Sequence, residues 1–560
     1  MSYKIHIENR DYTEWSWHEI ENMKDVTNNF HYNPVEKKLF TSDIVDNDCV
    51  LIESIIRDSA NIPGILIYGN KTYGRSNKGK FYYKCIPNDK HLPAFLVSYE
   101  EKDVRFNKKM VNKFVLFRFQ KWDDKHPIGA INQTIGDINN LNCFYEYQLY
   151  CKNLYVSLSQ FTKDTMKKLK QHTNELFIKT ISANNSSIEN RIDTHRIFTI
   201  DPNSTGDFDD AVSIDNEKIS IYIANVPILL EHYKLWNSFT KRISTIYLPD
   251  QKRPMLPSVL SEVLCSLLQN ESRIAFCIDI YYKDDQIIDI KYTNALIKVY
   301  KNFIYDEDEL LRFEDYNILK DKLLELSNTY KYIKCITDSH DVIAFLMILM
   351  NHECAKYMVN HKIGIYRNLK IKEIVDNKVP DDIYDFIKIW QCSCGSYNTF
   401  NEENSHELIY GGMKEYTHIT SPIRRLVDLL NMIKIQESLH FITMSEDMEK
   451  FYNYWIQNLD YINTTMRAIR KIQIDCSILN MCVNDKTITQ KTYPGYVFDK
   501  VERENKYNQY NVYLPELKII SRVNIKDNYE DYQKKDFKIY LIEDEATLKR
   551  KIRLQMICKY

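Results

Sequence analysis

The order of secondary-structure signals along the chain most strongly limits how it can fold. After residue 60, short runs rich in Tyr, Phe, Val and Ile alternate with Gly, Asn and Pro, as in IPGILIYGNKTYG and KFVLFRFQKW; this is typical of a small barrel of antiparallel strands. In the middle of the chain, helix-patterned segments such as SHDVIAFLMILMNHECAKYMVNH appear between strands and indicate a mixed α/β body. The last part returns to short strands. The sequence therefore predicts a multidomain protein, an α/β body flanked by small β barrels.

A chain of 560 residues is too long for a single hydrophobic core. We expect five segments, with these bounds: an N-terminal segment over 1–60, a barrel over 61–156, a linker over 157–190, the α/β body over 191–484 and a second barrel over 485–560. The start, MSYKIHIENRDYTEW, has no apolar signal core. The longest apolar run, Val342 to Met350, is too short to cross a bilayer and predicts a buried helix. We expect no association with membranes.

Composition argues against a globally basic nucleic-acid-binding protein and against a disulfide-rich secreted protein. Hydrophobic residues make up 44% and charged residues 27% of the chain, as in soluble globular proteins. The net charge is −2, so any nucleic-acid partner must be held by local basic patches. The thirteen cysteines are odd in number and scattered, which indicates reduced thiols in an intracellular compartment. We expect a soluble protein of the cytoplasm, with the nucleus as the other compartment that fits.

The segment 198–215, FTIDPNSTGDFDDAVSID, places four carboxylates, those of Asp201, Asp207, Asp209 and Asp210, between two apolar runs that resemble strands. Carboxylates held this close repel one another unless a cation neutralises them or water surrounds them. Hard oxygen ligands suit magnesium or manganese. Spacing alone leaves a metal site and an exposed acidic turn as equal alternatives.

Two motif matches fail on inspection. The acidic segment resembles a calcium-binding loop, but its twelfth position is Val212 instead of Glu and strands flank it instead of helices. The segment GRSNKGKF, residues 74–81, nearly matches a phosphate-binding loop, but Phe81 stands at the hydroxyl position and a strand-like run follows. We interpret the second match as a hairpin turn.

The segment 416–431, YTHITSPIRRLVDLLN, predicts a helix that begins near Ser421 with Pro422 at its first position. Arg424 and Arg425 would then lie in the first turn, where positive charge opposes the helix dipole. Binding of an anion beside them would explain this placement. A solvated pair of arginines is the alternative.

Three motifs together resemble the RNB family of 3′→5′ exoribonucleases, which includes bacterial ribonucleases II and R. They are TIDPNSTGDFDDAV, YLPDQKRPMLPSVLSEVLCSL (247–267) and YTHITSPIRRLVDLL. The resemblance covers roughly residues 60–560 and implies an RNB catalytic body between a cold-shock-type OB fold and a C-terminal RNA-binding OB fold. The segment 121–140 is similar to the eukaryotic, exosome-associated branch. That branch's N-terminal endonuclease domain has no room here, and the first cold-shock-like fold is reduced to residues 34–60. We therefore expect a free-standing, monomeric enzyme.

The resemblance implies roles for individual residues. Asp201 and Asp210 match metal ligands, while Asp207 and Asp209 complete the acidic metal site. Asp209 matches the carboxylate on which hydrolysis depends most, and Asp207 is assigned with it to the catalytic group. The implied cofactor is magnesium, or manganese in its place.

Other roles concern RNA. Arg424 matches an arginine that contacts the scissile phosphate, and Tyr247 matches an aromatic residue that stacks on the terminal bases. Arg425 and the basic patches at 467–471 and 549–551 are candidates for contacts with the phosphate backbone.

The implied function is processive, hydrolytic degradation of single-stranded RNA from a free 3′ end to nucleoside 5′-monophosphates, by two-metal-ion catalysis. The alternative is an inactive RNB-fold protein that binds RNA, but inactive relatives of this kind usually lose acidic residues, and all four remain here. The chain departs from the family pattern at Tyr222, Asn225, Asn431 and Met432. These departures bear on how the RNA is positioned and on the rate of its hydrolysis.

Overall fold

The computed structural model describes most of the chain. The described ranges are 2–28, 30–69, 71–101, 110–170, 174–184, 188–215, 217–368, 379–392, 395–401, 415–502, 508–544 and 549–557. They form two compact units. The barrel unit comprises Met1–Tyr155, Leu248–Asp250 and Lys471–Tyr560, and the α/β unit comprises Val156–Tyr247 and Gln251–Arg470.

The barrel unit contains a closed five-stranded barrel in the order β5-β6-β7-β9-β8. Its strands are β5 (Ile62–Leu66), β6 (Tyr82–Pro87), β7 (Phe95–Ser98), β8 (Lys113–Lys121) and β9 (Ile128–Asp137). Side chains of β6 alternate between partly exposed and buried, as the period of a strand requires. A Cβ added at Gly64 or Gly129 would lie 2.8 Å from the Phe117 ring, so glycine at both positions makes room for this ring. The predicted small β barrel is confirmed.

Further strands precede and follow this barrel in the same unit. Strands β1 (Tyr3–Ile7), β2 (Trp15–Glu19), β3 (Ile44–Val45) and β4 (Leu51–Glu53) form a sheet in the order β2-β1-β3-β4. Near the C-terminus, β20 (Thr492–Glu502), β21 (Asn508–Leu514), β22 (Ile519–Ile525), β23 (Lys534–Glu543) and β24 (Arg550–Met556) pair in the order β22-β21-β20-β23-β24. Helices α1 (Ile55–Asp58) and α2 (Leu141–Cys151) also belong to this unit. Residues 74–81 form a turn that leads into β6, as the hairpin interpretation predicted.

The α/β unit is built on a six-stranded sheet in the order β10-β17-β11-β12-β13-β16, in which β16 also pairs with β17. Its strands are β10 (Ile188–Asn190), β11 (Ile197–Asp201), β12 (Asp210–Ile214), β13 (Lys218–Ala224), β16 (Ser272–Lys283) and β17 (Gln286–Ile304). Two antiparallel sheets of two strands each, β14 (Ile246–Tyr247) with β15 (Lys252–Arg253) and β18 (Ile365–Asn368) with β19 (Ser396–Thr399), complete the strands among the described residues of this unit.

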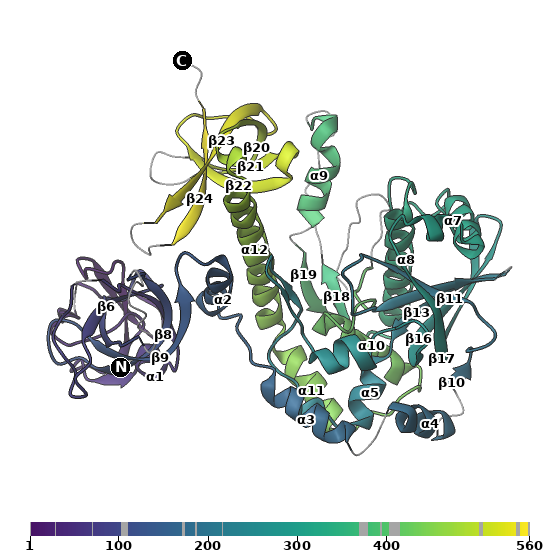
Figure 1. The fold of residues 1–560 in the computed structure, drawn as a ribbon, viewed down its shortest axis with the longest axis horizontal. Coiled ribbons are helices and arrows are strands. Elements are labelled where there is room, and N and C mark those ends of the chain that lie inside the picture. Colours follow the sequence, from purple (N-terminus) through teal and green to yellow (C-terminus); the bar gives the residue numbers. More distant parts are fainter. Residues whose placement is uncertain are drawn as a thin grey trace. The chain divides into compact units, whose positions relative to one another are not determined.

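Figure 1 shows the helices of this unit, several of which lie next to the sheet. They are α3 (Ser159–Leu169), α4 (Asn174–Asn184), α5 (Val226–His232), α6 (Asp308–Leu311), α7 (Glu314–Leu326), α8 (Ser339–Asn360), α9 (Asp381–Cys392), α10 (Leu426–Ser438) and α11 (Glu446–Gln457), and α12 (Leu459–Asn484) continues into the barrel unit. One core cluster joins buried side chains of α7 and α8 to those of β11, β12, β13 and β16. Residues 157–190, expected to be a linker, instead contribute α3, α4 and β10 to the α/β unit.

Helix α8 is the buried helix predicted from the run Val342 to Met350. By length and composition it is the one helix among the described residues that would suffice to cross a membrane. However, 67% of its most apolar window is buried inside the protein. Its capping box, formed by Asp338 and Asp341, is the N-terminal signal of an ordinary helix. We interpret α8 as a core helix of the α/β unit.

A buried ion pair ties β16 to the start of this sheet. The guanidinium of Arg191 donates to both carboxylate oxygens of Asp279, at 2.8 and 2.6 Å, and the Ser220 hydroxyl donates to the same carboxylate at 2.6 Å. Both charged side chains are almost fully buried. Burial by itself raises the pKa of Asp279, but the hydrogen bonds from Arg191 and Ser220 outweigh it and lower this pKa to about 2.

We predict that this pair makes the α/β unit sensitive to acid. Since the pKa of Asp279 is lower in the folded than in the unfolded protein, its contribution is present above about pH 4 and is lost as the pH falls towards 2. The loss amounts to about 2 kcal/mol. Urea unfolding at a series of pH values measures it. The matched control is Arg191→Met with Asp279→Leu, which removes both charges. The same acid dependence in both proteins would contradict the prediction.

Candidate active site

The acidic segment is a loop between two antiparallel strands at one edge of the sheet. Strand β11 ends at Asp201 and β12 begins at Asp210, and Phe198 of β11 lies opposite Val212 of β12. The strands are apolar and buried because both faces of the sheet are covered here. Pairing of the strands brings the two ends of the loop together. Strands flank the loop as predicted, which also excludes the EF-hand interpretation.

Asp209 joins this loop to the arginine-containing segment. Its side chain is 3% exposed. One carboxylate oxygen accepts the backbone N–H of Ile423 at 2.8 Å, and the other accepts Nε–H of Arg424 at 3.1 Å. Two motifs separated by more than two hundred residues therefore meet at a single carboxylate.

The helix after these arginines begins later than predicted. Helix α10 starts at Leu426, and Arg425 before it has an extended backbone. The reason is that two carboxylates bind backbone N–H groups of the preceding turn: Asp428 accepts from Ser421 and Asp209 accepts from Ile423. These side chains hold the turn in a non-helical conformation. Arg424 and Arg425 thus lie outside the helix, and the argument from the helix dipole does not apply to them.

Arg424 presents a free end to the acidic loop. Its side chain is 44% exposed, and within the described part of the chain Nε is the only side-chain nitrogen of Arg424 with a hydrogen-bond partner. The Thr245 N–H and the Ser244 hydroxyl both donate to the carbonyl oxygen of Arg424. The backbone is therefore anchored while both Nη groups remain available to an anion.

Arg425 is placed differently from its neighbour. Its Nη2 group donates to Asp428 at 2.8 Å, and Asp428 is fully buried. The Arg425 side chain is 24% exposed. This arginine orients the turn through Asp428, and its predicted contact with RNA rests on the small part of the side chain that reaches the surface.

Asp207 is paired with a lysine that the motifs did not single out. The Asp207 side chain is buried, and its Oδ1 atom lies 2.8 Å from Nζ of Lys252 on β15. The same Nζ lies 2.7 Å from Oε1 of Glu262, in the π-helical turn Val259–Leu264. Both partners lie within the second motif block. Spacing gave no signal for them, because only the pairing of β14 with β15 brings Lys252 beside Tyr247.

Burial raises the pKa values of three of the four loop carboxylates. Burial raises the pKa of Asp209 to about 7, against the opposing effect of Arg424. Burial also raises the pKa of Asp201, and the charges of Asp210 and Asp209 raise it further. Burial raises that of Asp210 as well. Because the cause is negative charge held in a poorly hydrated place, a bound cation would lower all three pKa values.

The donor set fits a divalent cation in part. The Oδ2 atoms of Asp201 and Asp207 are buried and lack hydrogen-bond partners, which is costly for a carboxylate unless a cation binds it. Yet no group of three His, Cys, Asp or Glu side chains within the described ranges is arranged to hold a metal ion without movement. Lys252 and Arg424 already occupy one side of Asp207 and of Asp209. Oxygen atoms remain available on Asp201, on Asp210 and, through Oδ2, on Asp207.

Two aromatic residues border the acidic loop. Tyr247 on β14 has 44% of its side chain exposed, and burial together with the nearby Asp207 charge raises its pKa. Tyr305 was missed at the sequence level. Its backbone N–H donates to the Asp201 carbonyl at 3.2 Å, and burial, then the charges of Asp210 and Asp201, raise its pKa. Tyr305 comes directly after β17 in the sequence. Because β17 runs parallel to β11, the ends of the two strands lie side by side, and Tyr305 is placed next to Asp201.

The four departures from the family pattern have structural roles. The Tyr222 hydroxyl lies 3.0 Å from that of Ser213 in the buried interior. The side chain of Asn225 is hydrogen-bonded to Asn294 and Gln436, and that of Asn431 bonds to β18 and the 417–418 segment. Met432 belongs to the hydrophobic core. All four side chains therefore pack inside the α/β unit and none of them lies at its surface.

The basic patches differ in exposure. Arg467, Arg470 and Lys471 of α12 are exposed. Lys549 is only 8% exposed, and its Nζ group contacts Asn88 and, at 3.3 Å, the sulfur of Cys151. The prediction that Lys549 follows the RNA backbone at the surface is therefore wrong, because tertiary packing buries its ammonium group.

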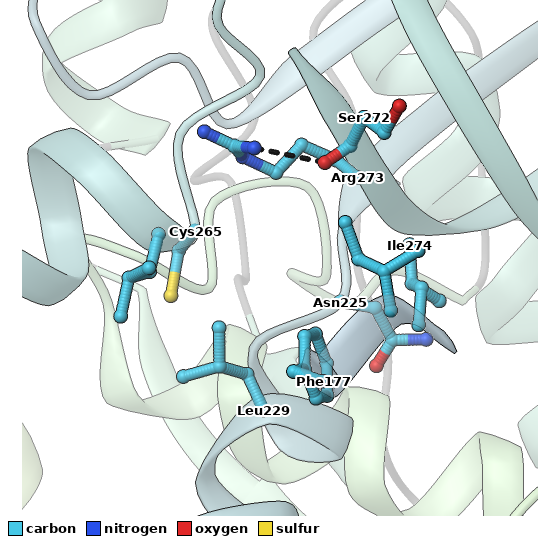
Figure 2. A pocket seen from close by; sticks show the side chains of 9 residues that line it. Phe177, Asn225, Leu229, Cys265, Ser272, Arg273 and Ile274 are labelled. Carbon is cyan, nitrogen blue, oxygen red and sulfur yellow. Dashed lines mark hydrogen bonds between the residues drawn. The ribbon is translucent and has the colours of Figure 1, made fainter. Parts of the chain in front are cut away.

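A small internal cavity lies elsewhere in the α/β unit (Figure 2). Its lining includes Phe177, Leu229, Cys265 and Ile274, and its volume of about 10 Å³ has room for no more than one water molecule. It contains none of the acidic residues and is not a substrate site.

Parts of the chain are similar to known proteins. Residues 190–334 match the family described as RNB domain. Ribonuclease R of Helicobacter pylori strain 26695 is 25% identical over 422 residues, which cover 62% of this chain and 63% of that protein. Ribonuclease R of Chlamydia trachomatis is 36% identical over 307 residues, covering 42% and 44%. The chain thus spans less than two thirds of the length of these relatives.

Solved structures show the same fold over nearly the whole chain. Apo RNase R of Mycoplasma genitalium matches with a TM-score of 0.67 at 16% identity, covering 99% of this chain and 100% of that one. Yeast Ssd1, described as a pseudonuclease, matches with a TM-score of 0.57 at 13% identity, covering 96% and 80%. The predicted α/β body flanked by OB folds is confirmed. Residues 190–334 thus match the RNB domain, the chain resembles ribonuclease R over part of its length, and its fold is that of RNase R.

Proposed function

We propose that the protein is a magnesium-dependent hydrolytic exoribonuclease that degrades single-stranded RNA from a free 3′ end and releases nucleoside 5′-monophosphates processively. One observation carries the proposal: Asp209 binds Arg424 at 3.1 Å beside buried carboxylate oxygens that lack partners. A protein that only held RNA would have no use for unneutralised, buried negative charge close to a phosphate-binding arginine.

Each residue of the site has its own role in the proposed phosphodiester hydrolysis. Asp201 and Asp210 would hold magnesium, or manganese, which would stabilise negative charge on the phosphate oxygens and assist deprotonation of the attacking water. Asp209 fixes the Arg424 side chain through Nε, so that the Nη groups are oriented before the phosphate arrives. Asp207, paired with Lys252, completes the acidic group. Two-metal-ion catalysis, which the family resemblance implies, is a prediction that a count of bound ions tests.

Removal of the metal ion tests the activity. A 5′-labelled single-stranded RNA of roughly thirty nucleotides, incubated with the protein and magnesium, is expected to shorten to one small end product, and EDTA is expected to stop the reaction. The same RNA with a 3′-phosphate and a matched single-stranded DNA are the substrate controls. Binding without cleavage under magnesium and manganese would support the alternative of an inactive RNA-binding protein. The Ssd1 likeness shows that this fold also occurs in a pseudonuclease.

Tyr247 is expected to bind the terminal bases by stacking. Its half-exposed ring borders Asp207 and Arg424, and stacking accepts any base, as a sequence-independent nuclease requires. We predict that Tyr247→Ala weakens RNA binding by about 1–3 kcal/mol, measured by fluorescence anisotropy in EDTA. Tyr247→Phe keeps the ring and serves as the matched control. Equal losses in both variants would assign the effect to the hydroxyl and contradict stacking.

We further propose that the protein acts as a free-standing monomer in a reducing compartment, with the cytoplasm as the expected location. The odd number and the scatter of the thirteen cysteines support a reducing environment. Sedimentation of the purified protein tests the oligomeric state, and tagged protein in cells tests the compartment.

A further inference from the structure

Glu262 lies against the acidic loop at the edge of the candidate site. It belongs to the π-helical turn Val259–Leu264, and its Oε1 atom lies 2.7 Å from Nζ of Lys252. A Cβ added at Gly206 of the loop would lie 3.7 Å from the Cγ atom of Glu262, so the glutamate side chain packs directly on the loop. Single π-helical turns are rare and are found frequently at functional sites.

Hydrogen bonds fasten this turn to the loop. The backbone N–H of Phe208 donates to the Ser266 hydroxyl at 2.9 Å, and that hydroxyl donates to a carbonyl of the same loop at 3.0 Å. Arg273 holds the turn from another side, because its Nη2 group donates to the Val263 carbonyl at 2.6 Å and its Nε–H donates to the Ser266 carbonyl at 3.0 Å. The backbone that carries Glu262 is therefore held in place before any substrate binds.

The Glu262 carboxylate presents negative charge to the solvent. Lys252 pairs with both Glu262 and Asp207, and one ammonium group cannot neutralise two carboxylates. Asp207 is buried, whereas the Glu262 side chain is 35% exposed, so Glu262 carries the remaining charge at the surface. Lys252 is its only polar partner among the described residues and contacts Oε1. The Oε2 atom is left to accept a hydrogen bond from a substrate.

Tyr247 places the last nucleotide of the RNA beside this carboxylate. In the β14–β15 pair, Tyr247 lies directly opposite Lys252, so both side chains point to the same side with their Cβ atoms about 4.5–5.5 Å apart. The proposed nuclease binds the scissile phosphate at Arg424 and stacks the terminal base on Tyr247. The ribose that joins this phosphate to this base then passes beside Lys252, within reach of Glu262.

We propose that Glu262 recognises the 3′ end of the RNA: its free carboxylate oxygen accepts a hydrogen bond from the 3′-hydroxyl of the terminal ribose, and its negative charge excludes a 3′-phosphate. The inference rests on the proposed function, because it names the residue that selects a 3′-hydroxyl in that nuclease. Glu262 determines specificity and takes no part in bond cleavage. Lys252 is a positioning residue, which orients the Glu262 carboxylate through their ion pair.

RNAs that differ only at the 3′ end test this inference. The same 5′-labelled sequence ends in a 3′-hydroxyl, a 3′-phosphate or a 3′-deoxyribose, and the loss of full-length RNA in magnesium gives kcat/KM for each. Wild-type protein is expected to prefer the 3′-hydroxyl over the 3′-phosphate by about a hundredfold or more, because the phosphate would lie against a carboxylate. It is expected to prefer the 3′-hydroxyl over the 3′-deoxyribose by about fivefold, which is the effect of one hydrogen bond.

Glu262→Gln removes the charge and keeps the size of the side chain. This variant is expected to raise kcat/KM for the 3′-phosphate RNA by about tenfold or more, a gain that a misfolded protein cannot show. Glu262→Ala also removes the acceptor oxygen, so it is expected to lose the preference for the 3′-hydroxyl over the 3′-deoxyribose. Glu309→Gln is the matched control, because Glu309 of α6 is an exposed glutamate that also pairs with a lysine, Lys301. It is expected to keep both preferences.

The outcomes separate this inference from the proposed function. Equal rejection of the 3′-phosphate RNA by wild-type protein and Glu262→Gln would assign the exclusion to size or to another charge and would overturn the role of Glu262. Equal rates of wild-type protein on the 3′-hydroxyl and 3′-phosphate RNAs would overturn it as well. The nuclease itself would stand in both cases. No hydrolysis of the 3′-hydroxyl RNA by wild-type protein would overturn the proposed nuclease together with this inference.

Discussion

Asp209→Asn is expected to slow RNA hydrolysis by about a thousandfold or more while RNA binding stays unchanged. The carboxylate accepts two hydrogen bonds, one on each oxygen, from Ile423 and Arg424. An asparagine amide offers one acceptor oxygen and one NH₂ donor, so one of the two N–H groups must lose its partner. The negative charge that holds the Arg424 guanidinium is lost as well.

Single-turnover kinetics with labelled RNA measures the chemical step in this variant, and anisotropy in EDTA measures binding. Asp215→Asn is the matched control, because it makes the same chemical change just after β12, at an exposed residue whose side chain accepts, among the described residues, only local backbone N–H groups. Hydrolysis by Asp209→Asn within tenfold of wild type would remove Asp209 from the catalytic group. Loss of RNA binding together with activity would instead indicate that the fold around Asp209 has collapsed.

Replacement of Arg424 by alanine is expected to lower kcat about 100- to 1,000-fold with a smaller change in KM. Its Nη groups are free to bind the phosphate, where negative charge develops during hydrolysis. The turn itself should survive, because its contacts with Thr245 and Ser244 are made by the Arg424 backbone.

Arg424→Lys tests whether charge alone suffices. Lysine has no Nε–H on a rigid planar fork and cannot bind Asp209 and a phosphate in the same geometry, so we expect it to restore little of the rate. Arg196→Ala is the control, since Arg196 is an exposed arginine of the same unit that pairs with Asp315. Full activity of Arg424→Lys would show that a point charge, rather than an oriented guanidinium, is what the reaction needs.

Much of the fold could be predicted because its signals are local. Alternating burial along β6 and the continuous apolar core of α8 follow from the periods of strands and helices. The strands on either side of the acidic loop were predicted for the same reason. The start of α10 was predicted wrongly, because a carboxylate far away in the sequence, Asp209, binds the N–H of Ile423. A local pattern contains no information about that partner.

In the candidate site, too, local features could be predicted and contacts between distant residues could not. Its acidic residues, its arginine and Tyr247 could be named from the sequence, because their chemistry and their motifs are local. Lys549 was assigned to the surface from its basic neighbours, yet packing against Asn88 and Cys151 buries it. Charge in a sequence does not reveal exposure when the neighbours that cover a residue come from another part of the chain.

The sequence by itself determined the elements, the RNB motifs and the set of carboxylates that can hold a cation. Only the tertiary structure decided which of these carboxylates already have partners. Lys252 binds Asp207 across 45 positions of sequence and Arg424 binds Asp209 across 215. Contacts at such separations depend on how strands, hairpins and turns pack together, and the energy of a buried charge depends on the groups within a few ångströms of it. That local environment exists only in the folded chain.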